Sequence, residues 1–453
     1  MKPQALNEIA FKLGLTFDSK KIVTGASVDS RLLQAGDLFF ALPGTKVDGH
    51  SFLEAAAIAG AGAAVVRKDY NGPHFGLPLL FVDNVLDSLQ RLSKLILQEG
   101  NAKTIAVTGS LGKTTTKEFL VSLLKNKFKV SASPGNGNSQ IGLPLAILNH
   151  TSVNDEIIIL EMGMTKPGQL SKLVEIAPPD IALITTVALV HAENFNSLED
   201  IAKAKAEIFS HPSTRIGLYH TESDLGGLLK ITGSCLKQSF STTASKCDFS
   251  LQVIGNHMVV KEPGQMTPKK LPLLAIPGGH NRHNFIAAVS VARNLGLDWE
   301  EIEKFQSQLQ LPERRLELVE RQGVMFVNDA YNASEMSMKG ALDSLPVPGK
   351  GKKKIAFFGG MVELGKFSDA CHRAVAKYAL ERVDVMLCFG SDCLPMVEEW
   401  EKVGRQVIWA KEREELLPLL HQQLQSGDVV LLKGSQAKGV WKVLEELSNL
   451  RVQ

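Results

Sequence analysis

The sequence predicts an α/β protein of three domains, spanning residues 1–100, 101–311 and 312–453. A chain of 453 residues is too long for a single hydrophobic core. Several short segments are apolar throughout, which is typical of parallel strands covered by helices on both faces. After residue 312, strand-like and helix-like segments alternate, so we expect a doubly wound, Rossmann-like third domain there.

Composition excludes several classes of protein. The net charge of +2 provides no general attraction for nucleic acid or for a membrane surface. No apolar run approaches the roughly 18 residues of a membrane span, and the first residues lack the apolar segment of a secretory signal. The five cysteines include no Cys-x-x-Cys pair, which fits reduced thiols. We therefore expect a cytoplasmic protein with no nucleic-acid partner and no membrane insertion.

The first domain reads as a small α/β unit. It ends in a helix-like pattern of apolar residues followed by Gly100; the pattern is Leu86, Leu89, Leu92, Leu95 and Ile96.

The second domain opens with a predicted nucleotide-binding turn. An apolar strand at residues 105–107 leads into a glycine-rich turn, and a helix-like segment follows. In this layout, backbone N–H groups and the helix dipole bind phosphates. Lys113 is expected to reach the outer phosphates and the Thr114 hydroxyl to bind Mg²⁺. The predicted nucleotide-binding residues of the turn are Gly109, Ser110, Leu111, Gly112, Lys113, Thr114 and Thr115.

The turn is shorter than the common P-loop, because only two residues, not four, separate Gly109 from Gly112. The alternative interpretation is a Gly-Lys-Thr turn that binds no ligand.

Two polar residues follow neighbouring apolar strands of the second domain. Glu161 comes directly after residues 157–160, and His191 lies a few residues beyond a strand expected at 181–187. Ligands of open α/β sheets bind at the carboxyl ends of strands, and Mg²⁺ prefers oxygen ligands. The alternatives are a solvent-facing carboxylate for Glu161 and an ordinary polar loop residue for His191.

Lys205 falls on the apolar face of a predicted helix. Ser197 begins an acidic capping box, and Ile201, Lys205 and Ile208 then share one face at helical spacing. Lys203 lies off that face beside Glu199 and Glu207 and is expected to be solvated. Burial lowers the pKa of a lysine, and a neutral amine can react with CO₂ to give an anionic metal ligand. The alternative is a lysine that extends to water.

Two segments rich in asparagine are further candidates for ligand binding. Asn281 and Asn284 open a helix-like run and could hydrogen-bond a base edge or cap the helix. Asn136 and Asn138 lie in a polar turn at residues 135–140, for which a plain turn is the alternative. Residues 220–275 are more polar and read as short strands and turns.

In the third domain, two charged residues close predicted strands. Asp329 follows residues 324–327 and Lys433 follows residues 429–432, which indicates a second half-site at carboxyl strand ends. The other strands are expected at residues 355–358, 385–389 and 407–409.

These motifs resemble the Mur ligases, the ATP-dependent amide ligases of peptidoglycan precursor assembly, over all three domains. Residues 108–116 resemble the family's short P-loop, Glu161 its Mg²⁺ glutamate and residues 188–191 the segment with its metal histidine. Residues 204–209 resemble the segment with its carbamylated lysine, and residues 279–284 its adenine site. Arg315 and Asp329 resemble nucleotide contacts from the third domain.

The resemblance implies ATP and two Mg²⁺ ions as cofactors, with carbamylation at Lys205. It makes Lys113, Glu161, His191 and Lys205 the candidate catalytic residues. The candidate metal ligands are Thr114, Glu161, His191 and Lys205.

Further motifs resemble the branch of the family that adds the terminal dipeptide. Asp29, Ser30 and Arg31 resemble the UDP-binding domain of the members that add the third residue and of those that add the terminal dipeptide. Residues 161–164 and 331–333 are similar to motifs of the dipeptide-adding branch. The implied reaction joins D-alanyl-D-alanine to UDP-N-acetylmuramoyl-tripeptide, by a chain expected to be a monomer. Substrate contacts are expected at Ser30, Arg31, Asn136, Asn138, Asn332 and Lys433.

Four positions depart from that branch, all in the third domain: Asn328, Ser334 with Glu335, Gly360 and Gln436. They bear on acceptor specificity more than on reaction class. The alternatives are the branch that adds the third amino acid, a folylpolyglutamate synthase, and a nucleotide-binding regulatory protein that does not ligate. The first domain argues against the folate enzyme, which lacks it.

Overall fold

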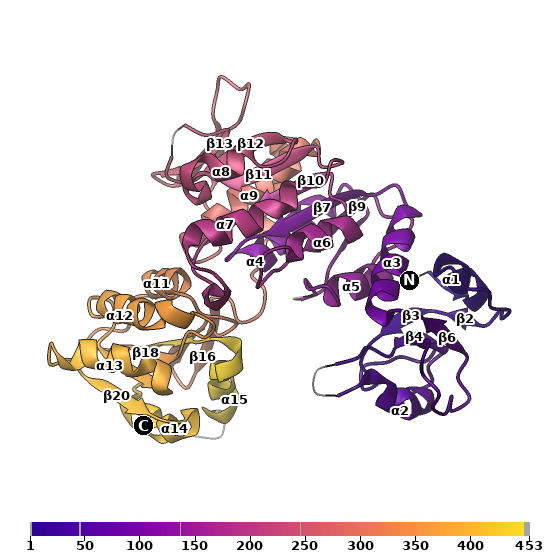
Figure 1. Cartoon of the computed structure of the whole chain (residues 1–453). Coiled ribbons are helices and arrows are strands. Elements are labelled where there is room, and N and C mark those ends of the chain that lie inside the picture. Colours follow the sequence, from indigo (N-terminus) through magenta and orange to yellow (C-terminus); the bar gives the residue numbers. More distant parts are fainter. Residues whose placement is uncertain (1, 45–46, 136, 245, 448–453) are drawn as a thin grey trace.

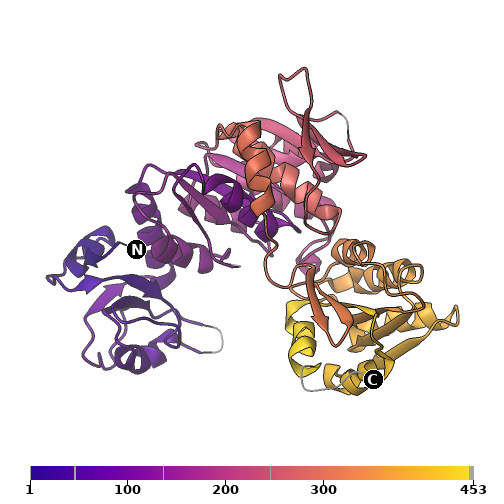
Figure 2. The same ribbon diagram turned by 180° about the vertical axis from the view of Figure 1, so that it is seen from behind.

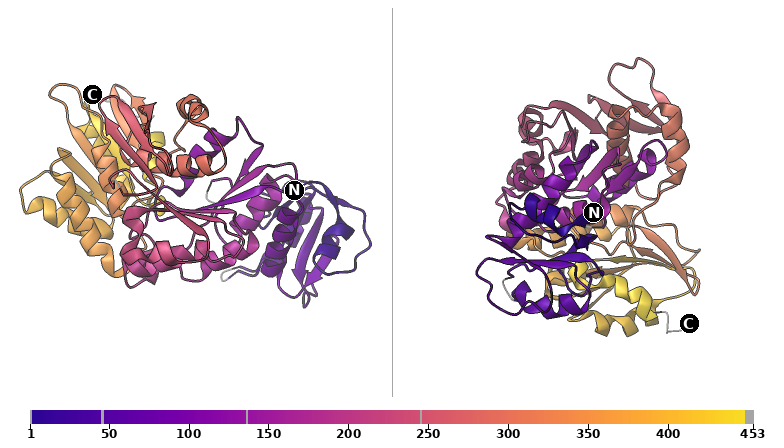
Figure 3. Two further views of the ribbon diagram at one scale, coloured as in Figure 1. Left: turned by 90° about the horizontal axis from the view of Figure 1, so that it is seen from above. Right: turned by 90° about the vertical axis from the view of Figure 1, so that its right-hand side faces the viewer.

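The computed structural model describes residues 2–44, 47–135, 137–244 and 246–447. They form three α/β bodies in chain order (Figure 1). The first and third bodies flank the central one and lie apart from each other, as the reverse view also shows (Figure 2). Seen from above, they occupy opposite ends of the molecule (Figure 3, left). The α/β class predicted from the sequence is therefore confirmed.

The first body contains a four-stranded parallel sheet in the order β3-β4-β5-β6 and a two-stranded antiparallel sheet of β1 and β2. Helix α3 forms where the leucine pattern predicted a helix, and Asn84 caps its first turn. The strands are β1 (Gln4–Ala5), β2 (Ile22–Val23), β3 (Gly25–Ser27), β4 (Asp37–Phe40), β5 (Ala63–Arg67) and β6 (Leu79–Val82), and the helices are α1 (Leu6–Lys12), α2 (Leu53–Ile58) and α3 (Val85–Gln98).

The central body is built on one nine-stranded sheet, in the order β15-β14-β13-β12-β11-β10-β7-β9-β8. Its strands are β7 (Lys103–Thr108), β8 (Val130–Ala132), β9 (Ile157–Glu161), β10 (Ile181–Ile184), β11 (Ile216–His220), β12 (Leu236–Ser241), β13 (Phe249–Ile254), β14 (His257–Lys261) and β15 (Lys269–Pro272). Its helices are α4 (Lys113–Leu124), α5 (Gly142–His150), α6 (Gln169–Ile176), α7 (Leu198–Ala206), α8 (Leu228–Ile231), α9 (His280–Asn294) and α10 (Trp299–Phe305).

The polar stretch at residues 220–275 forms short strands as predicted, and these strands extend the central sheet. From β8 to β13 neighbouring strands are parallel, whereas β14 and β15 add antiparallel hairpins at the edge.

Apolar runs in the central strands face two separate cores. In β9, Ile157 and Ile159 belong to one hydrophobic cluster, while Ile158 and Leu160 belong to the other. The first cluster contains buried residues of α4 and α9, and the second contains those of α6 and α7. Because both faces are covered, residues 157–160 of the strand are all apolar, as the sequence predicted.

The third body is a six-stranded sheet in the order β16-β17-β21-β18-β19-β20, parallel except for the β16–β17 hairpin. The strands are β16 (Glu317–Arg321), β17 (Val324–Asn328), β18 (Lys354–Gly359), β19 (Val385–Phe389), β20 (Val407–Ala410) and β21 (Val429–Lys433). The helices are α11 (Glu335–Asp343), α12 (Ser368–Ala379), α13 (Leu394–Glu401), α14 (Arg413–Gln423) and α15 (Val443–Leu447).

Five strands of this body lie where the sequence predicted them, within one or two residues at each end. The pattern missed β16, because this edge strand is largely exposed and three of its five residues are charged.

One predicted strand end is wrong. The strand expected at residues 181–187 ends at Ile184, because the chain then turns to hold the P-loop. The Thr185 hydroxyl donates to the carbonyl oxygens of Leu111 and Thr108 at 2.5 and 3.1 Å, and the Ser110 N–H donates to the Thr186 carbonyl at 2.6 Å.

The bodies are joined by packed contacts. Asn149 at the end of α5 exchanges two hydrogen bonds of 2.8 Å with the backbone of Ala26 in β3. Leu148 joins the core of the first body, and one apolar cluster continues from the central body into the third. Among the described residues, no helix is long and apolar enough to cross a membrane.

The central core offers a stability test. Leu183 of β10 is fully buried, so Leu183→Ala is expected to lower the free energy of unfolding by about 2–5 kcal/mol. Leu236→Ala in β12 of the same sheet is the matched control: Leu236 is 63% exposed, and the expected loss is about 0.5 kcal/mol or less. Urea unfolding measures both, and equal losses would contradict this description of the core.

Candidate functional site

The predicted P-loop joins β7 to α4 through two glycines that cannot be replaced without cost. Gly112 is the N-cap of α4 with φ 82°, and a Cβ there would overlap the Asn284 side-chain oxygen. Gly109 has φ 149°, and a Cβ there would overlap the Thr185 hydroxyl. The backbone therefore approaches its neighbours more closely than a side chain permits. The amino-terminal N–H groups of α4 begin at this turn.

Lys113, the first residue of α4, lies folded over the loop. Its Nζ donates to the Gly109 carbonyl at 2.8 Å and to the Ser110 carbonyl at 3.4 Å. Burial lowers the pKa of the Lys113 ammonium, and the Glu161 carboxylate partly offsets this. A cation held in this way favours an anionic ligand, which would restore the charge balance lost on burial.

Glu161 is pinned at the end of β9 by hydrogen bonds to both of its carboxylate oxygens. The Thr114 hydroxyl donates to Oε2 at 2.8 Å, and the Asn138 side-chain amide donates to Oε1 at 2.7 Å. Its backbone N–H donates to the Ser133 hydroxyl at 2.9 Å, and the residue is 1% exposed. Glu161 is thus a buried, oriented carboxylate and not the solvent-facing one of the alternative interpretation.

The helix carrying Lys205 forms as the sequence predicted. Ser197 caps α7 by accepting from the Asp200 N–H at 3.2 Å. Lys205 is only 4% exposed and shares the buried face with Ile201 and Ile208. Lys203 is solvated as expected, although its ion-pair partner is Asp200, at 3.9 Å, and not Glu199 or Glu207.

Lys205 is an unusual buried amine. No residue in the described part of the chain forms a hydrogen bond or ion pair with its Nζ. Burial lowers the pKa of Lys205 well below its usual value, and the charge on Lys113 lowers it further. The neutral amine form is therefore favoured at this position.

His191 is held by a residue that sequence reasoning missed. Its Nδ1 contacts the carboxylate of Glu363, which follows β18 in the third body. Both residues have left-handed backbones, with φ 54° and 62°, and the Glu193 N–H donates to the Glu363 carbonyl at 3.1 Å. Nothing in the sequence pattern paired two loops 172 positions apart. The contact leaves Nε2 of His191 as the ring nitrogen available to a ligand.

Two cavities lie between the central and third bodies. The cavity at the P-loop measures about 490 Å³ and is lined by Lys113, Thr114, Glu161, His191 and Lys205, among others. All four predicted metal ligands thus face one space. Across the described part of the chain, no three His, Cys, Asp or Glu side chains are grouped to hold a metal ion by themselves. A metal here would need oxygens from its substrates as well.

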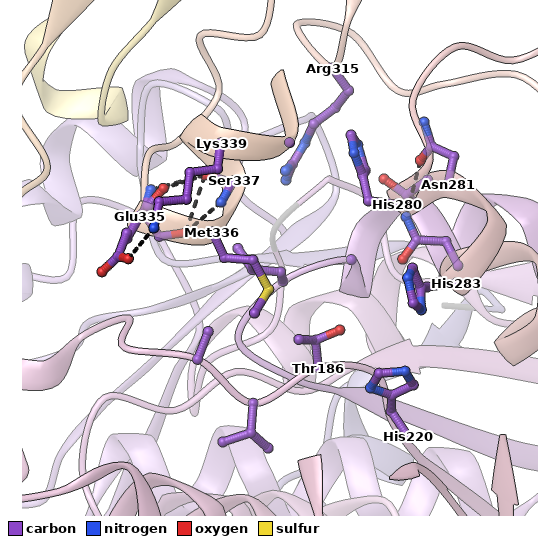
Figure 4. Close-up of a pocket in the computed structure, with 18 of the residues that line it drawn as sticks. Thr186, His220, His280, Asn281, His283, Arg315, Glu335, Met336, Ser337 and Lys339 are labelled. Atoms are coloured by element: carbon purple, nitrogen blue, oxygen red, sulfur yellow. Dashed lines mark hydrogen bonds and ion pairs between the residues drawn. The ribbon is translucent and has the colours of Figure 1, made fainter. Parts of the chain in front are cut away.

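The second cavity, of about 570 Å³, begins at Leu111 and Gly112 and extends past Asn281 and Asn284 to α11 (Figure 4). Arg315 lines both cavities. In Figure 4, His220 and His283 lie together on one side of this cavity, across from Ser337 and Lys339.

Hydrogen bonds of Asn281 and Asn284 of α9 connect that helix to the start of α4, beside the P-loop. The Asn281 amide donates to the Pro277 carbonyl at 2.7 Å, and the Asn284 amide donates to Asn281 Oδ1 at 3.1 Å. The Thr116 hydroxyl donates to Asn284 Oδ1 at 3.4 Å. Neither residue is the N-cap, which is Gly279. Their contact with a base stays a prediction.

The third body contributes a buried ion pair and an arginine. Lys433 Nζ contacts Asp329 Oδ2 at 2.6 Å and also donates to the carbonyls of Asp329 and Asn332, so its three protons are used. Arg315 lies over the Tyr331 ring at 4.1 Å, and its neighbours Arg314 and Leu316 have positive φ. The interdomain segment is therefore bent so that Arg315 points into both cavities.

The predicted substrate residues are dispersed. Arg31 is exposed and pairs with Asp29 at 2.6 Å, and neither Ser30 nor Arg31 lines the two interdomain cavities. Asn332 lines the P-loop cavity, as does Asn138, whose amide orients Glu161. Asn136 lies outside the described residues.

Comparison with known families covers most of the chain. Residues 22–96 match the description "Mur ligase family, catalytic domain", residues 107–292 match "Mur ligase middle domain", and residues 314–436 match "Mur ligase, glutamate ligase domain". The chain belongs to the Mur ligase family. The family resemblance predicted from its motifs is confirmed.

Two relatives of this Mur ligase match over more than three quarters of their own length. The UDP-N-acetylmuramoyl-tripeptide–D-alanyl-D-alanine ligase of Bacillus subtilis (strain 168) is 33% identical over 94% of this chain and 93% of its own. The ligase of the same name from Escherichia coli (strain K12) is 32% identical over 78% of each chain.

Solved structures agree with the fold. MurF from Thermotoga maritima in complex with ADP has a TM-score of 0.78 at 28% identity, over 94% of this chain and 97% of that one. MurF from Acinetobacter baumannii has a TM-score of 0.85 at 24% identity, over 99% of both chains, and bears on the fold alone.

Gly112 generates a prediction with a matched control. Gly168 caps α6 with φ 80°, like Gly112, but has nothing within 4 Å of a built Cβ. Gly168→Ala is expected to cost only backbone strain, about 1–2 kcal/mol. Gly112→Ala is expected to cost more, because it also displaces Asn284. Urea unfolding of both variants measures the difference, and Gly112→Ala combined with Asn284→Ala should recover part of the excess. Equal losses would contradict the close approach.

Proposed function

We propose that this Mur ligase joins D-alanyl-D-alanine to UDP-N-acetylmuramoyl-tripeptide at the expense of ATP, releasing ADP and phosphate. The names of full-length relatives at 27–33% identity support the substrates, and the ADP complex of Thermotoga maritima MurF supports the nucleotide. The observation that carries the proposal is the cavity in which Lys113 and the Thr114–Glu161 pair face residues of the third body.

The nucleotide is proposed to bind with its phosphates at residues 109–115 and its remaining contacts at Asn281, Asn284, Arg315 and Asp329. Lys113 would turn from the loop carbonyls to the outer phosphates, where its charge offsets the charge developing in transfer. The buried cations around this cavity fit a polyanion, since an anion lowers the cost of keeping them charged.

The residues also fit Mg²⁺. Thr114 and Glu161 would supply oxygen ligands for one ion, and His191 Nε2 with a carbamylated Lys205 would supply ligands for a second. Bound Mg²⁺ would offset negative charge on the phosphate oxygens. Asn138 keeps the Glu161 carboxylate aimed at the Thr114 hydroxyl, so the first pair is oriented before any ligand arrives.

Ligation is proposed to pass through an acyl phosphate. A tripeptide carboxylate oxygen attacks the γ-phosphorus, the bond to the β-phosphate oxygen breaks, and ADP leaves. The dipeptide amine then attacks the acyl carbon to give a tetrahedral intermediate, which loses phosphate and a proton to leave the amide. Residues of both bodies line the cavity, so closure between them would exclude water from the acyl phosphate.

Lys205 is proposed to be carbamylated by CO₂. The neutral amine attacks the carbon of CO₂, an N–C bond forms, an N–H proton is lost, and an anionic carbamate results. Burial without a hydrogen-bond partner favours the neutral amine that this step needs.

The remaining assignments are part of the proposal. Ser30, Arg31, Asn138, Asn332 and Lys433 are proposed substrate contacts, with domain boundaries near residues 100 and 311. We expect a monomer that acts in the cytoplasm.

The direct test is phosphate release from ATP with mass spectrometry of the nucleotide product. Release is expected only when both UDP-tripeptide and D-alanyl-D-alanine are present, and Lys113→Ala should lower turnover about a thousandfold. Lys125→Ala, an exposed lysine at the other end of α4, is the control and should keep normal turnover. Preference for a single amino acid as acceptor, or ATP binding without turnover, would refute the proposal.

Lys205→Ala tests carbamylation. Turnover is expected to fall by more than about tenfold and to recover partly with a short carboxylic acid, which replaces the carbamate oxygens. Lys203→Ala on the exposed face of the same helix is the control and should need no rescue. Independently of activity, ¹³C NMR with labelled CO₂ should show a carbamate signal that Lys205→Ala removes and Lys203→Ala keeps. A signal that persists in Lys205→Ala would contradict the assignment.

A further inference from the structure

The larger cavity contains a polar residue that neither the sequence motifs nor the proposed mechanism uses. His220 is the last residue of β11, two strands from β7 in the central sheet. Neighbouring strands lie about 5 Å apart, so its backbone lies roughly 10 Å from the strand that leads into the P-loop. Because β7, β10 and β11 are parallel, His220 and the P-loop emerge at the same edge of the sheet.

His220 is buried and has unused hydrogen-bonding capacity. It is 4% exposed and lines the cavity that begins at Leu111 and Gly112. Neither Nδ1 nor Nε2 has a hydrogen-bond partner among the residues described. Buried polar atoms are nearly always paired in folded proteins, and leaving one unpaired costs about 1–3 kcal/mol. Unpaired ring nitrogens at a cavity wall therefore indicate a ligand that forms the missing hydrogen bond.

The ring is held in a defined orientation. It meets the His283 ring edge to face, with centroids 5.0 Å apart, and lies against Phe240 at 5.6 Å. His283 is itself held by the Thr242 hydroxyl, 2.9 Å from its Nε2. Figure 4 shows His220 beside Thr186 and below His283 at one side of the cavity.

Two neighbouring side-chain amides already have partners within the protein. The Asn281 and Asn284 amides bond to Pro277 and to each other. Burial lowers the pKa of His220 to about 4, so the ring is neutral near pH 7, with one nitrogen as donor and the other as acceptor. A purine edge presents both donors and acceptors, so it can pair with either nitrogen.

We propose that His220 hydrogen-bonds the edge of the purine base of the nucleotide whose phosphates the P-loop holds. The cavity walls beside it include Leu111, Val187 and Leu316, which are suited to the flat faces of a base. This inference rests on the proposed ATP-dependent function and adds a positioning residue for its nucleotide.

The test compares dissociation constants by titration calorimetry in the full chain, using a non-hydrolysable ATP analogue and inorganic tripolyphosphate. His220→Phe replaces the imidazole with an aromatic ring that has no nitrogen atoms. It is expected to bind the analogue about fivefold more weakly, the loss of one neutral hydrogen bond, and tripolyphosphate unchanged. His257→Phe, an exposed histidine of β14, is the control and should leave both constants unchanged.

Thermal stability gives a second measurement. If His220 served only the fold, its replacement would lower the thermal midpoint. His220→Phe removes two unpaired buried atoms, so its thermal midpoint without ligand should equal or exceed that of the unaltered chain. His220→Gln, which keeps a donor and an acceptor, should recover part of the analogue affinity.

Two results would overturn the inference: unchanged analogue binding by His220→Phe, or an equal loss for analogue and tripolyphosphate. Failure of the unaltered chain to bind the analogue would instead overturn the proposed function.

Discussion

Burial of positive charge between the central and third bodies is the constraint on which the site depends. Lys113, Lys205 and Lys433 are all withdrawn from water, and burial lowers the pKa of each. Only Lys433 has a carboxylate within hydrogen-bond distance, that of Asp329. The cost of the other two is offset by loop carbonyls at Lys113 and by a shift toward the neutral amine at Lys205. The triphosphate of the proposed nucleotide would supply the missing negative charge. The buried lysines, which are costly in the free protein, would then favour the bound ligand.

Two side chains of the site depend on the junction between the central and third bodies. His191 belongs to the central body, but Glu363 of the third body determines which of its nitrogens is available. Arg315 lies in the connecting segment and reaches both cavities because its neighbours adopt left-handed backbones. A proposed metal ligand and a proposed nucleotide contact therefore both depend on how the third body sits against the second. The proposed closure would therefore act on the site through His191 and Arg315, in addition to excluding water.

Much of this could be predicted from local pattern. The P-loop, the strand ending at Glu161 and the buried face carrying Lys205 each follow from spacing within about ten residues, and all form as predicted. The contacts that complete the site join distant positions: Asn138 with Glu161, Glu363 with His191, and His220 with the cavity wall. Periodicity carries no information about which loops meet. The exposed, charged strand β16 has only two apolar residues, which form neither an alternating pattern nor a longer apolar run.

Two of the four departures in the third body, Gly360 and Gln436, lie close to an ion pair of this body. Gly360 stands where the family resemblance leads to an aspartate, and a Cβ there would lie 2.7 Å from the Cβ of Asp392. Asp392 pairs with Lys438 at 2.7 Å, while Gln436 stands where an arginine is expected. A carboxylate and a cation, at positions 392 and 438, therefore lie paired beside Gly360 at this end of the sheet. Because the Asp392 side chain occupies the space that a Cβ at position 360 would need, an aspartate at 360 could be accommodated only if Asp392 moved.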